Sequence, residues 1–369
     1  MSDQVVVFSE LETLKGLRMG VARLNAPRAL NALSLDMIRL LDAQLRQWQQ
    51  DDNIVAVWLE GEGDRAFCAG GDVVKMYESM QPVGERNTFL ETYFAEEYQL
   101  DYLLHLYAKP LLCWGHGVVM GGGMGLLQGA RFRIVTESAR MAMPEITIGL
   151  YPDVGGSWFL QRTPGKTGLF AGLTGLHLNA SDALFMTLAE QHIKAQQQAS
   201  LKQACCALSY SNDSEHNAGL IGALLEQFSS SPEAPSRVAE HFDQINHLCG
   251  GATLAQVVER LDAWSTEDAW LAKALAAYRK GSVQTVRLVW EQLQRARYLS
   301  LADIFRMEWI LSVRCGMGTE FREGVRALLV DKDNHPAFYW KNIEDITAQE
   351  LALYFQSPLT PHPLAGLGR

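Results

Sequence analysis

The chain has 369 residues, of which 48% are hydrophobic and 20% charged, a composition typical of a folded globular protein. Its formal net charge of −10 argues against a nucleic-acid or membrane-surface partner, because both surfaces are anionic. The six cysteines form no CxxC spacing, which gives a metal site or a thioredoxin-like function little support. Residues 1–8 lack the features of a targeting peptide and no apolar run approaches the ~20 residues of a membrane span, so we expect a cytoplasmic location.

The first half of the chain alternates segments typical of strands with segments typical of helices. Short apolar runs predict strands at residues 5–8, 17–24, 54–59, 111–114 and 131–136. Ser34 is suited to cap a helix whose apolar residues recur at helical spacing from Ile38 to Trp48, and residues 85–107 form a second helical stretch. Strands and helices in this order predict an α/β layered core.

The second half is mainly helical by the same criteria. Thr253 and Gln256 have the spacing of a capping box ahead of an amphipathic segment. Further helices are predicted to begin at Ser265, Ser282 and Ser300. We therefore divide the chain into a core, residues 1–195, and a mainly helical C-terminal region, residues 196–369.

Two glycine-rich segments are candidates for ligand contact through the backbone. Residues 66–72 (AFCAGGD) would let a backbone N–H approach a ligand, while Asp72 is also placed to cap the next helix. Residues 115–125 contain six glycines and match neither a dinucleotide fingerprint nor a phosphate-binding P-loop. Their N–H groups suit a developing oxyanion, such as that of a thioester under attack. His116 could act as a base, but a buried and hydrogen-bonded histidine is the simpler interpretation.

A third segment, residues 144–156, carries two carboxylates in mostly apolar surroundings. Burial raises the pKa of a carboxyl group, so Glu145 and Asp153 could do acid–base or nucleophilic work near neutral pH. The alternative is structural: Glu145 would cap a turn, and Asp153 would cap a helix that begins near Gly155. Spacing alone leaves both interpretations open.

These three segments, in this order, resemble those of the enoyl-CoA hydratase/isomerase (crotonase) family, and residues 25–33 resemble its loop that contacts coenzyme A. The resemblance implies a spiral of ββα units, followed here by a helical region that closes over the core. It also implies a small-molecule acyl-CoA substrate and an oxyanion hole formed by the N–H groups of Gly71 and Gly122. Glu145 falls where the family has a catalytic glutamate. No metal and no cofactor beyond the CoA of the substrate is implied.

One departure from the hydratases is informative. Their other catalytic glutamate falls at Gly125 here, and Asp153 replaces a small residue. Residues 144–156 instead resemble the branch of the family that hydrolyses 3-hydroxyisobutyryl-CoA in valine degradation. Residues 94–98 resemble a helix of that branch in which a glutamate, here Glu97, reaches the substrate. Residues 323–333 resemble its closing motif.

The resemblance implies thioester hydrolysis, in which Glu145 either attacks the carbonyl to give a mixed anhydride or activates water. Asp153 and Glu97 would bind the 3-hydroxyl group of the substrate. Asp72 and Arg28 are further substrate-binding candidates, Arg28 together with Lys75 for the CoA phosphates.

Two other functions stay open at this point. One is hydration or isomerisation of an enoyl-CoA with Glu145 acting alone. The other is CoA-thioester binding without catalysis, which would not require a carboxylate at Glu145. Oligomeric state is also open: members of the family are commonly trimers, but a long helical C-terminal half could cover the same surface and leave a monomer.

Overall fold

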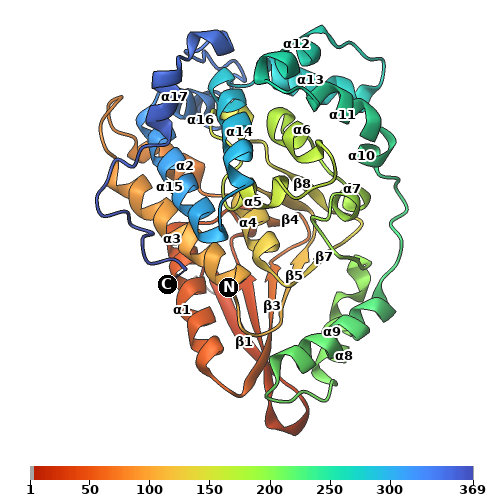
Figure 1. Cartoon of the computed structure of the whole chain (residues 1–369). Coiled ribbons are helices and arrows are strands. Elements are labelled where there is room, and N and C mark those ends of the chain that lie inside the picture. Colours follow the sequence, from red (N-terminus) through yellow and green to blue (C-terminus); the bar gives the residue numbers. More distant parts are fainter. Residues whose placement is uncertain (1–3, 369) are drawn as a thin grey trace. The chain divides into compact units, whose positions relative to one another are not determined.

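The computed structural model describes residues 4–368 and contains two β-sheets (Figure 1). The larger sheet has the order β1-β2-β3-β5-β7-β9, in which β1 and β2 are antiparallel and the later neighbours are parallel. Its strands are β1 (Val6–Glu12), β2 (Arg18–Leu24), β3 (Ile54–Gly61), β5 (Leu111–Gly115), β7 (Phe132–Val135) and β9 (Gln191–His192). The smaller sheet comprises β4 (Ala66–Cys68), β6 (Val118–Met120) and β8 (Arg140–Ala142). All five predicted strands are confirmed.

The predicted helices of the first half are also confirmed. Helix α1 begins after Ser34, whose side chain accepts the N–H of Met37, and its predicted apolar face is buried from Ile38 to Trp48. The helices up to residue 185 are α1 (Leu35–Gln50), α2 (Val73–Ser79), α3 (Thr88–His105), α4 (Gly122–Gly129), α5 (Gly156–Leu160), α6 (Thr167–Thr174) and α7 (Ala180–Phe185). Short 3-10 turns are η1 (Leu14–Gly16), η2 (Pro27–Ala29) and η3 (Glu145–Ile148).

The second half is helical, with one cap placed differently from the prediction. The capping box of Thr253 and Gln256 is present at the start of α12, but α13 is capped by Asp268 and not by Ser265. The Asp268 carboxylate accepts two N–H groups of the first turn, which a serine hydroxyl three residues earlier does not reach. The helices are α8 (Gln198–Cys206), α9 (Ser214–Phe228), α10 (Arg237–Glu240), α11 (Phe242–Cys249), α12 (Leu254–Ala263), α13 (Ala269–Lys280), α14 (Val283–Ala296), α15 (Leu301–Met317), α16 (Glu320–Val325) and α17 (Ala348–Tyr354), with η4 (Ala195–Gln197), η5 (Arg326–Val330) and η6 (Ile343–Asp345) between them.

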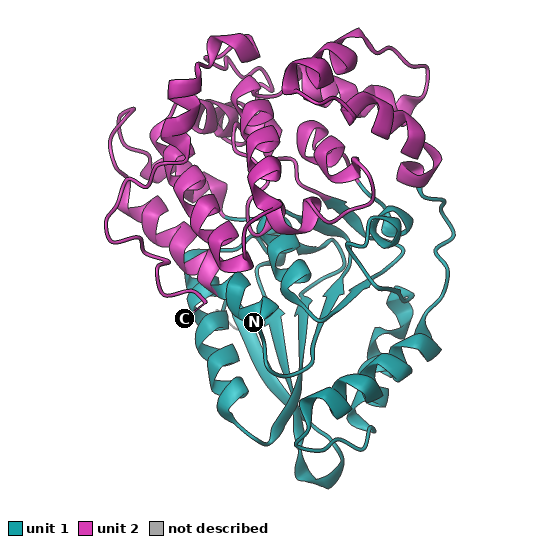
Figure 2. Cartoon of the chain, viewed as in Figure 1, with its two compact units in different colours: residues 1–71, 100–141, 178–236 teal, residues 72–99, 142–177, 237–369 magenta. Residues whose placement is uncertain are grey.

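The chain forms two compact units, each discontinuous in sequence (Figure 2). Unit 1 contains residues up to Gly71, Leu100–Met141 and Leu178–Ser236; unit 2 contains Asp72–Gln99, Ala142–His177 and Arg237 onward. The core of unit 1 packs around the larger sheet and includes the stacked rings of Trp58 and Trp114. These units are defined by contacts within the fold, so the division of the sequence at residue 195 stays a prediction.

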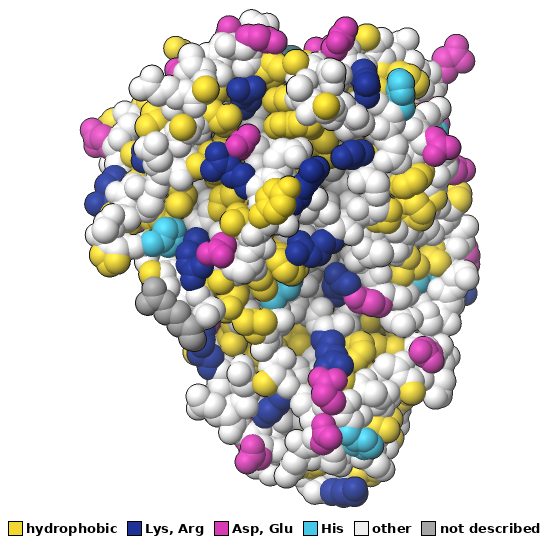
Figure 3. All heavy atoms as spheres, in the orientation of Figure 1, with side chains coloured by type: hydrophobic (Ala, Val, Ile, Leu, Met, Phe, Trp, Pro, Cys, Tyr) yellow, Lys and Arg dark blue, Asp and Glu magenta, His cyan; other side chains and the backbone are white. Residues whose placement is uncertain are grey.

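The surface carries charges of both signs. On the face drawn in Figure 3, basic and acidic side chains are interspersed with apolar ones. Within residues 4–368, no helix combines the length and the apolar character needed to span a membrane.

Candidate active site

The two predicted oxyanion donors, Gly71 and Gly122, both follow short strands of unit 1. Gly70 has φ +115°, a conformation that favours glycine, and a Cβ added to it would lie 3.9 Å from the nitrogen of Gly122. A Cβ on Gly123 would lie only 2.2 Å from the carbonyl oxygen of Cys68. The glycines are therefore required because two backbone segments lie against each other here.

The N–H of Gly122 is available to a ligand because of its place in the helix. Gly122 is the first residue of α4, and an N–H in the first turn has no partner within its helix. Gly121 before it has φ +47° and caps α4 without a side chain. The helix dipole favours negative charge at this end, as an oxyanion hole requires. The role of both glycines in catalysis stays a prediction.

The other candidates near the first glycine segment have ordinary structural roles. Asp72 caps α2, where its Oδ1 accepts the N–H of Lys75 at 3.1 Å. The Lys75 ammonium pairs with Glu78 at 3.0 Å, and Arg28 is exposed on η2. His116 is buried and its Nε2 lies 2.8 Å from the carbonyl oxygen of Gly63, which agrees with the structural interpretation. Substrate contacts of Asp72, Lys75 and Arg28 stay predictions.

Three predicted carboxyl groups, those of Glu97, Glu145 and Asp153, are brought together in unit 2. Each is no more than 5% exposed. Burial and the neighbouring Asp153 raise the pKa of Glu97 and of Glu145 well above the usual value. Burial raises the pKa of Asp153 to about 6, while its hydrogen bonds with Tyr98 and with its own backbone oppose the rise. The Oε2 atom of Glu145 has no hydrogen-bond partner among the described residues.

The alternative that Asp153 caps the following helix is wrong. Helix α5 begins at Gly156, whose N–H is accepted by the backbone carbonyl of Asp153, and the side chain that accepts N–H groups at this helix start is the carboxylate of Glu308 on α15. Glu308 accepts the N–H of Gly155 at 2.7 Å and that of Ser157 at 2.9 Å. Asp153 is thereby left to bond with the hydroxyl of Tyr98 at 2.6 Å.

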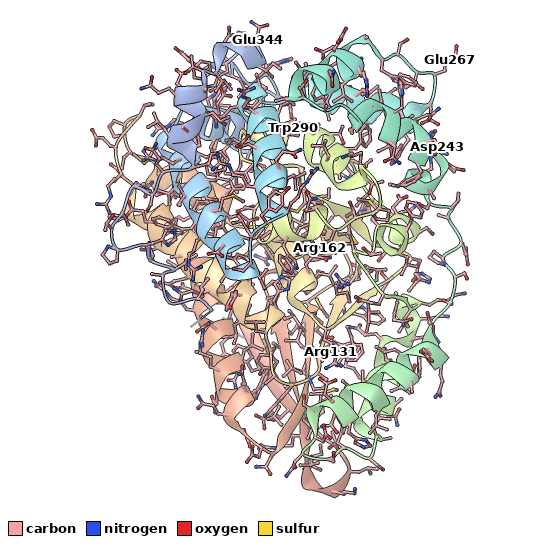
Figure 4. All side chains as sticks on the ribbon, in the orientation of Figure 1. Arg131, Arg162, Asp243, Glu267, Trp290 and Glu344 are labelled. Carbon is pink, nitrogen blue, oxygen red and sulfur yellow. The ribbon has the colours of Figure 1, made fainter. Side chains whose placement is uncertain are left out.

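The backbone around Asp153 is strained and is held from α14 and α15. Val154 has φ +52°, which is rare for a β-branched residue and persists only where the surroundings fix it. The Thr285 hydroxyl donates to the carbonyl of Leu150, and Gln292 donates to that of Pro152 at 3.0 Å. Figure 4 labels Trp290 on α14, the helix that supplies both donors.

Two further contacts fix the ends of this segment. Arg162, labelled in Figure 4, follows α5. Its guanidinium carbon lies 3.2 Å from the ring centroid of Trp158, and its Nη1 donates to the Trp158 carbonyl at 2.8 Å. On the other side, Gly324 of the predicted closing motif packs on Ile148, and a Cβ there would lie 2.3 Å from the Ile148 backbone. The closing motif therefore supports η3, which carries Glu145.

The chain matches the enoyl-CoA hydratase/isomerase family over residues 19–355, which is most of its length. The chain belongs to this family. It is 35% identical over 357 residues to the Xenopus tropicalis protein named "3-hydroxyisobutyryl-CoA hydrolase, mitochondrial", covering 97% of this chain and 91% of that one.

Solved structures of the enoyl-CoA hydratase/isomerase family share the fold. The carnitinyl-CoA dehydratase of Mycobacterium thermoresistibile has a TM-score of 0.86 at 32% identity and covers 100% of both chains. The enoyl-CoA hydratase of Rhodobacter sphaeroides has a TM-score of 0.81 at 31% identity, covering 96% of this chain and 98% of that one. The predicted crotonase-like α/β fold with a mainly helical C-terminal region is confirmed.

Sequence reasoning missed the residues that surround the carboxyl groups of this family member. Tyr98, Ser312 and Glu308 lie on segments predicted as helices, and Tyr151 lies between the two carboxylates of residues 144–156. Their meeting depends on contacts between residues 55 to 214 positions apart. One signal was present: Glu308 is a carboxylate within an apolar helical segment, where an uncompensated charge is costly.

Proposed function

We propose that this chain hydrolyses 3-hydroxyisobutyryl-CoA to free CoA and 3-hydroxyisobutyrate, a step of valine degradation. The observation that carries the proposal is the cluster of Glu97, Glu145 and Asp153, buried in one unit without a hydratase-type glutamate at position 125. The name of the Xenopus relative supports the same activity.

In this mechanism the substrate's acyl oxygen accepts the N–H groups of Gly71 and Gly122. Loss of one such donor typically costs ~3 kcal/mol of transition-state stabilisation. The Glu145 carboxylate then either attacks the acyl carbon or removes a proton from the attacking water, and the C–S bond breaks as CoA leaves with its electron pair and takes up a proton. On the anhydride route, a water molecule afterwards cleaves the bond between the acyl group and Glu145.

The acyl preference follows from the two remaining carboxyls. A buried carboxyl that lacks a partner is costly, and a substrate hydroxyl can satisfy it. We assign this contact to Asp153 and Glu97; burial, and after it the charge of Asp153, raise the pKa of Glu97. Recognition of a hydroxyl in this way can reject the analogue without it by up to ~10⁴.

Hydration of an enoyl-CoA is the second candidate, because both solved structures named above carry dehydratase or hydratase titles. Hydration places one water between two carboxylates, whereas position 125, inside α4, is a buried glycine. The substrate CoA is the only cofactor in our proposal, and a metal has no part in it. Acyl-CoA is the only partner it requires, and a homo-oligomer remains compatible with it.

A cytoplasmic location stays a prediction, and the Xenopus protein is named as mitochondrial. The chemistry assigned above is the same in either compartment.

One assay distinguishes the two activities. The protein is mixed separately with 3-hydroxyisobutyryl-CoA and with crotonyl-CoA, and free thiol and enoyl absorbance are followed. We expect thiol release from the first substrate and no loss of enoyl absorbance from the second. Loss of enoyl absorbance without thiol release would replace hydrolysis by hydration, and neither signal would favour binding without catalysis.

A further inference from the structure

Three hydroxyl groups connect Asp153 to a backbone carbonyl through four short oxygen–oxygen contacts, all within unit 2. The Tyr98 hydroxyl lies 2.6 Å from Asp153 Oδ2 and 2.6 Å from Ser312 Oγ. The Ser312 hydroxyl in turn lies 2.8 Å from that of Tyr151, which lies 2.6 Å from the carbonyl oxygen of Glu308. We call Tyr98, Ser312 and Tyr151 the hydroxyl chain.

The hydroxyl chain is one proton short of its contacts. Each hydroxyl group has one proton to donate, and a backbone carbonyl has none. Four contacts at hydrogen-bond distance need four protons, and three hydroxyls supply three. We propose that the fourth belongs to the Asp153 carboxyl, and that Ser312 and Tyr151 are positioning residues that hold Asp153 in its protonated form.

The two protonation states differ in the direction of the bond between Asp153 and Tyr98 and in the number of contacts that contain a proton. With Asp153 protonated, it donates to Tyr98, Tyr98 to Ser312, Ser312 to Tyr151, and Tyr151 to the Glu308 carbonyl, so every contact has a proton. With Asp153 ionised, Tyr98 must donate to it, and the hydroxyls of Ser312 and Tyr151 have two protons for the three contacts that remain. Whichever way these two hydroxyls turn, one contact has two facing oxygens with no proton between them, which is a buried and unsatisfied contact.

The following groups, all among the described residues, feel the charge of Asp153, and none of them carries a positive charge in place of that proton. They are Glu97 and Tyr98 on α3, Glu145 on η3, Tyr151 between η3 and α5, and Glu308 and Cys315 on α15. All are acids or hydroxyls, and each of them is disfavoured from ionising by a charge on Asp153. Burial raises the pKa of Asp153 to about 6, so this carboxyl retains its proton to a higher pH than an exposed aspartate does.

A neutral Asp153 would aid the proposed function, on which this consequence rests. Two adjacent carboxylates cannot readily ionise together, so a proton on Asp153 lets Glu145 carry the negative charge that attack or base catalysis needs. The second oxygen of the protonated Asp153 remains an acceptor for a substrate hydroxyl. The hydroxyl chain would thereby keep Asp153 neutral, to bind the substrate hydroxyl, while Glu145 carries the charge used in attack or base catalysis.

The test measures the pKa of Asp153 directly, in the complete protein without substrate. The carbonyl stretch of a protonated carboxylic acid is followed by infrared spectroscopy against pH, and the part that disappears in Asp153→Asn is assigned to Asp153. We expect Ser312→Ala and Tyr151→Phe to lower the apparent pKa by about one unit. In both variants the remaining hydroxyls find acceptors whether or not Asp153 is protonated. Tyr98→Phe should raise it, because the ionised carboxylate loses its donor.

The opposite model predicts the opposite sign. If the hydroxyl chain only donated towards a carboxylate, Ser312→Ala would weaken that donation and raise the pKa of Asp153. Tyr107→Phe is the matched control, since the Tyr107 hydroxyl also donates to a carbonyl, that of Leu45 at 2.6 Å, but belongs to no such chain. It should leave the Asp153 signal unchanged.

Upward or absent shifts in Ser312→Ala and Tyr151→Phe would overturn the proposal. Each variant removes a single oxygen atom. If one of them fails to fold, the direction of the Asp153 pKa shift in the other still tests the proposal. Because no turnover is measured, failure here is distinct from failure of the proposed hydrolysis.

Discussion

Glu145 and Asp153 are both buried carboxyl groups, yet they differ in the donors that surround them. Asp153 bonds with Tyr98 and with its own backbone, whereas the Oε2 of Glu145 meets no partner among the described residues. Burial therefore raises the pKa of Glu145 well above its usual value, while that of Asp153 rises only to about 6. On these pKa directions alone Asp153 would ionise before Glu145, and it is the proton count of the hydroxyl chain that assigns the proton to Asp153 instead.

Glu145→Gln should abolish turnover while the CoA ester still binds. The amide preserves the shape of the side chain but can neither attack the thioester nor remove a proton. We expect kcat to fall by about 10³-fold, within the range of about 10²–10⁴ that is typical when such a group is lost. Thiol release gives kcat, and calorimetry with substrate gives Kd. Glu259→Gln, an exposed change on α12, serves as control. Retention of a tenth of the rate would show that Glu145 is not the catalytic group.

Asp153→Ala should narrow the preference for 3-hydroxyisobutyryl-CoA over isobutyryl-CoA, by about tenfold or more. The rate on the hydroxylated substrate should fall, because the variant loses the acceptor for the 3-hydroxyl group. Glu97 shares this pocket and could preserve part of the preference. Since Glu308 and not Asp153 caps α5, a lost cap would not explain the change. The ratio of kcat/KM values decides, and an unchanged ratio would exclude hydroxyl recognition by Asp153.

At the scale of helices and strands, a helix start could be predicted where the capping residue and the N–H group it accepts are close in sequence. Ser34 caps α1 and Thr253 pairs with Gln256 within three residues, so local pattern was sufficient for both helices. The role of Asp153 could not be settled in this way. The start of α5 is capped by Glu308, which lies more than 150 positions further along the chain than the N–H groups it accepts. The proposed roles of the glycine segments and of the buried carboxyls came from a motif resemblance, whereas the hydroxyl groups around Asp153 could be found only in the structure.

Gly122→Pro tests the proposed oxyanion donor because it removes the N–H outright. Gly122 is the first residue of α4, a position at which proline is well tolerated because its missing N–H has no helical partner. We expect kcat to fall by about 10²–10³. Gly122→Ala retains the N–H and is the matched control, expected to stay close to wild type. Circular dichroism should show the same helix content in all three proteins. A folded proline variant with full activity would refute the assignment.

At the scale of the whole molecule, the pKa values of buried carboxyl groups shift in opposite directions in the two units. In unit 1, Glu60 is buried but pairs with Lys202 and with Arg23, and these cations lower its pKa despite the burial. In unit 2, the pKa of Asp153 is raised to about 6 and that of Glu308 to about 8, with burial as the main cause in both. The first arrangement favours a charge in the folded state, and the second favours a proton.

This difference predicts that the free energy of unfolding decreases as the pH rises from about 4 to about 8. A carboxyl whose pKa is raised on folding stabilises the protein fully below its unfolded pKa, about 4, and loses that contribution as the pH passes the folded value, here about 6 for Asp153 and about 8 for Glu308. Each group contributes a slope of at most about 1.4 kcal/mol per pH unit. The Glu308→Gln side chain cannot ionise, and it retains one acceptor oxygen for the start of α5. In this variant the unfolding free energy should therefore fall less steeply with pH between roughly 6 and 8. Urea unfolding at several pH values measures both slopes, with the exposed Glu259→Gln expected to follow wild type. Equal slopes in wild type and Glu308→Gln would mean that Glu308 is already ionised in the folded protein, held so by the N–H groups of Gly155 and Ser157.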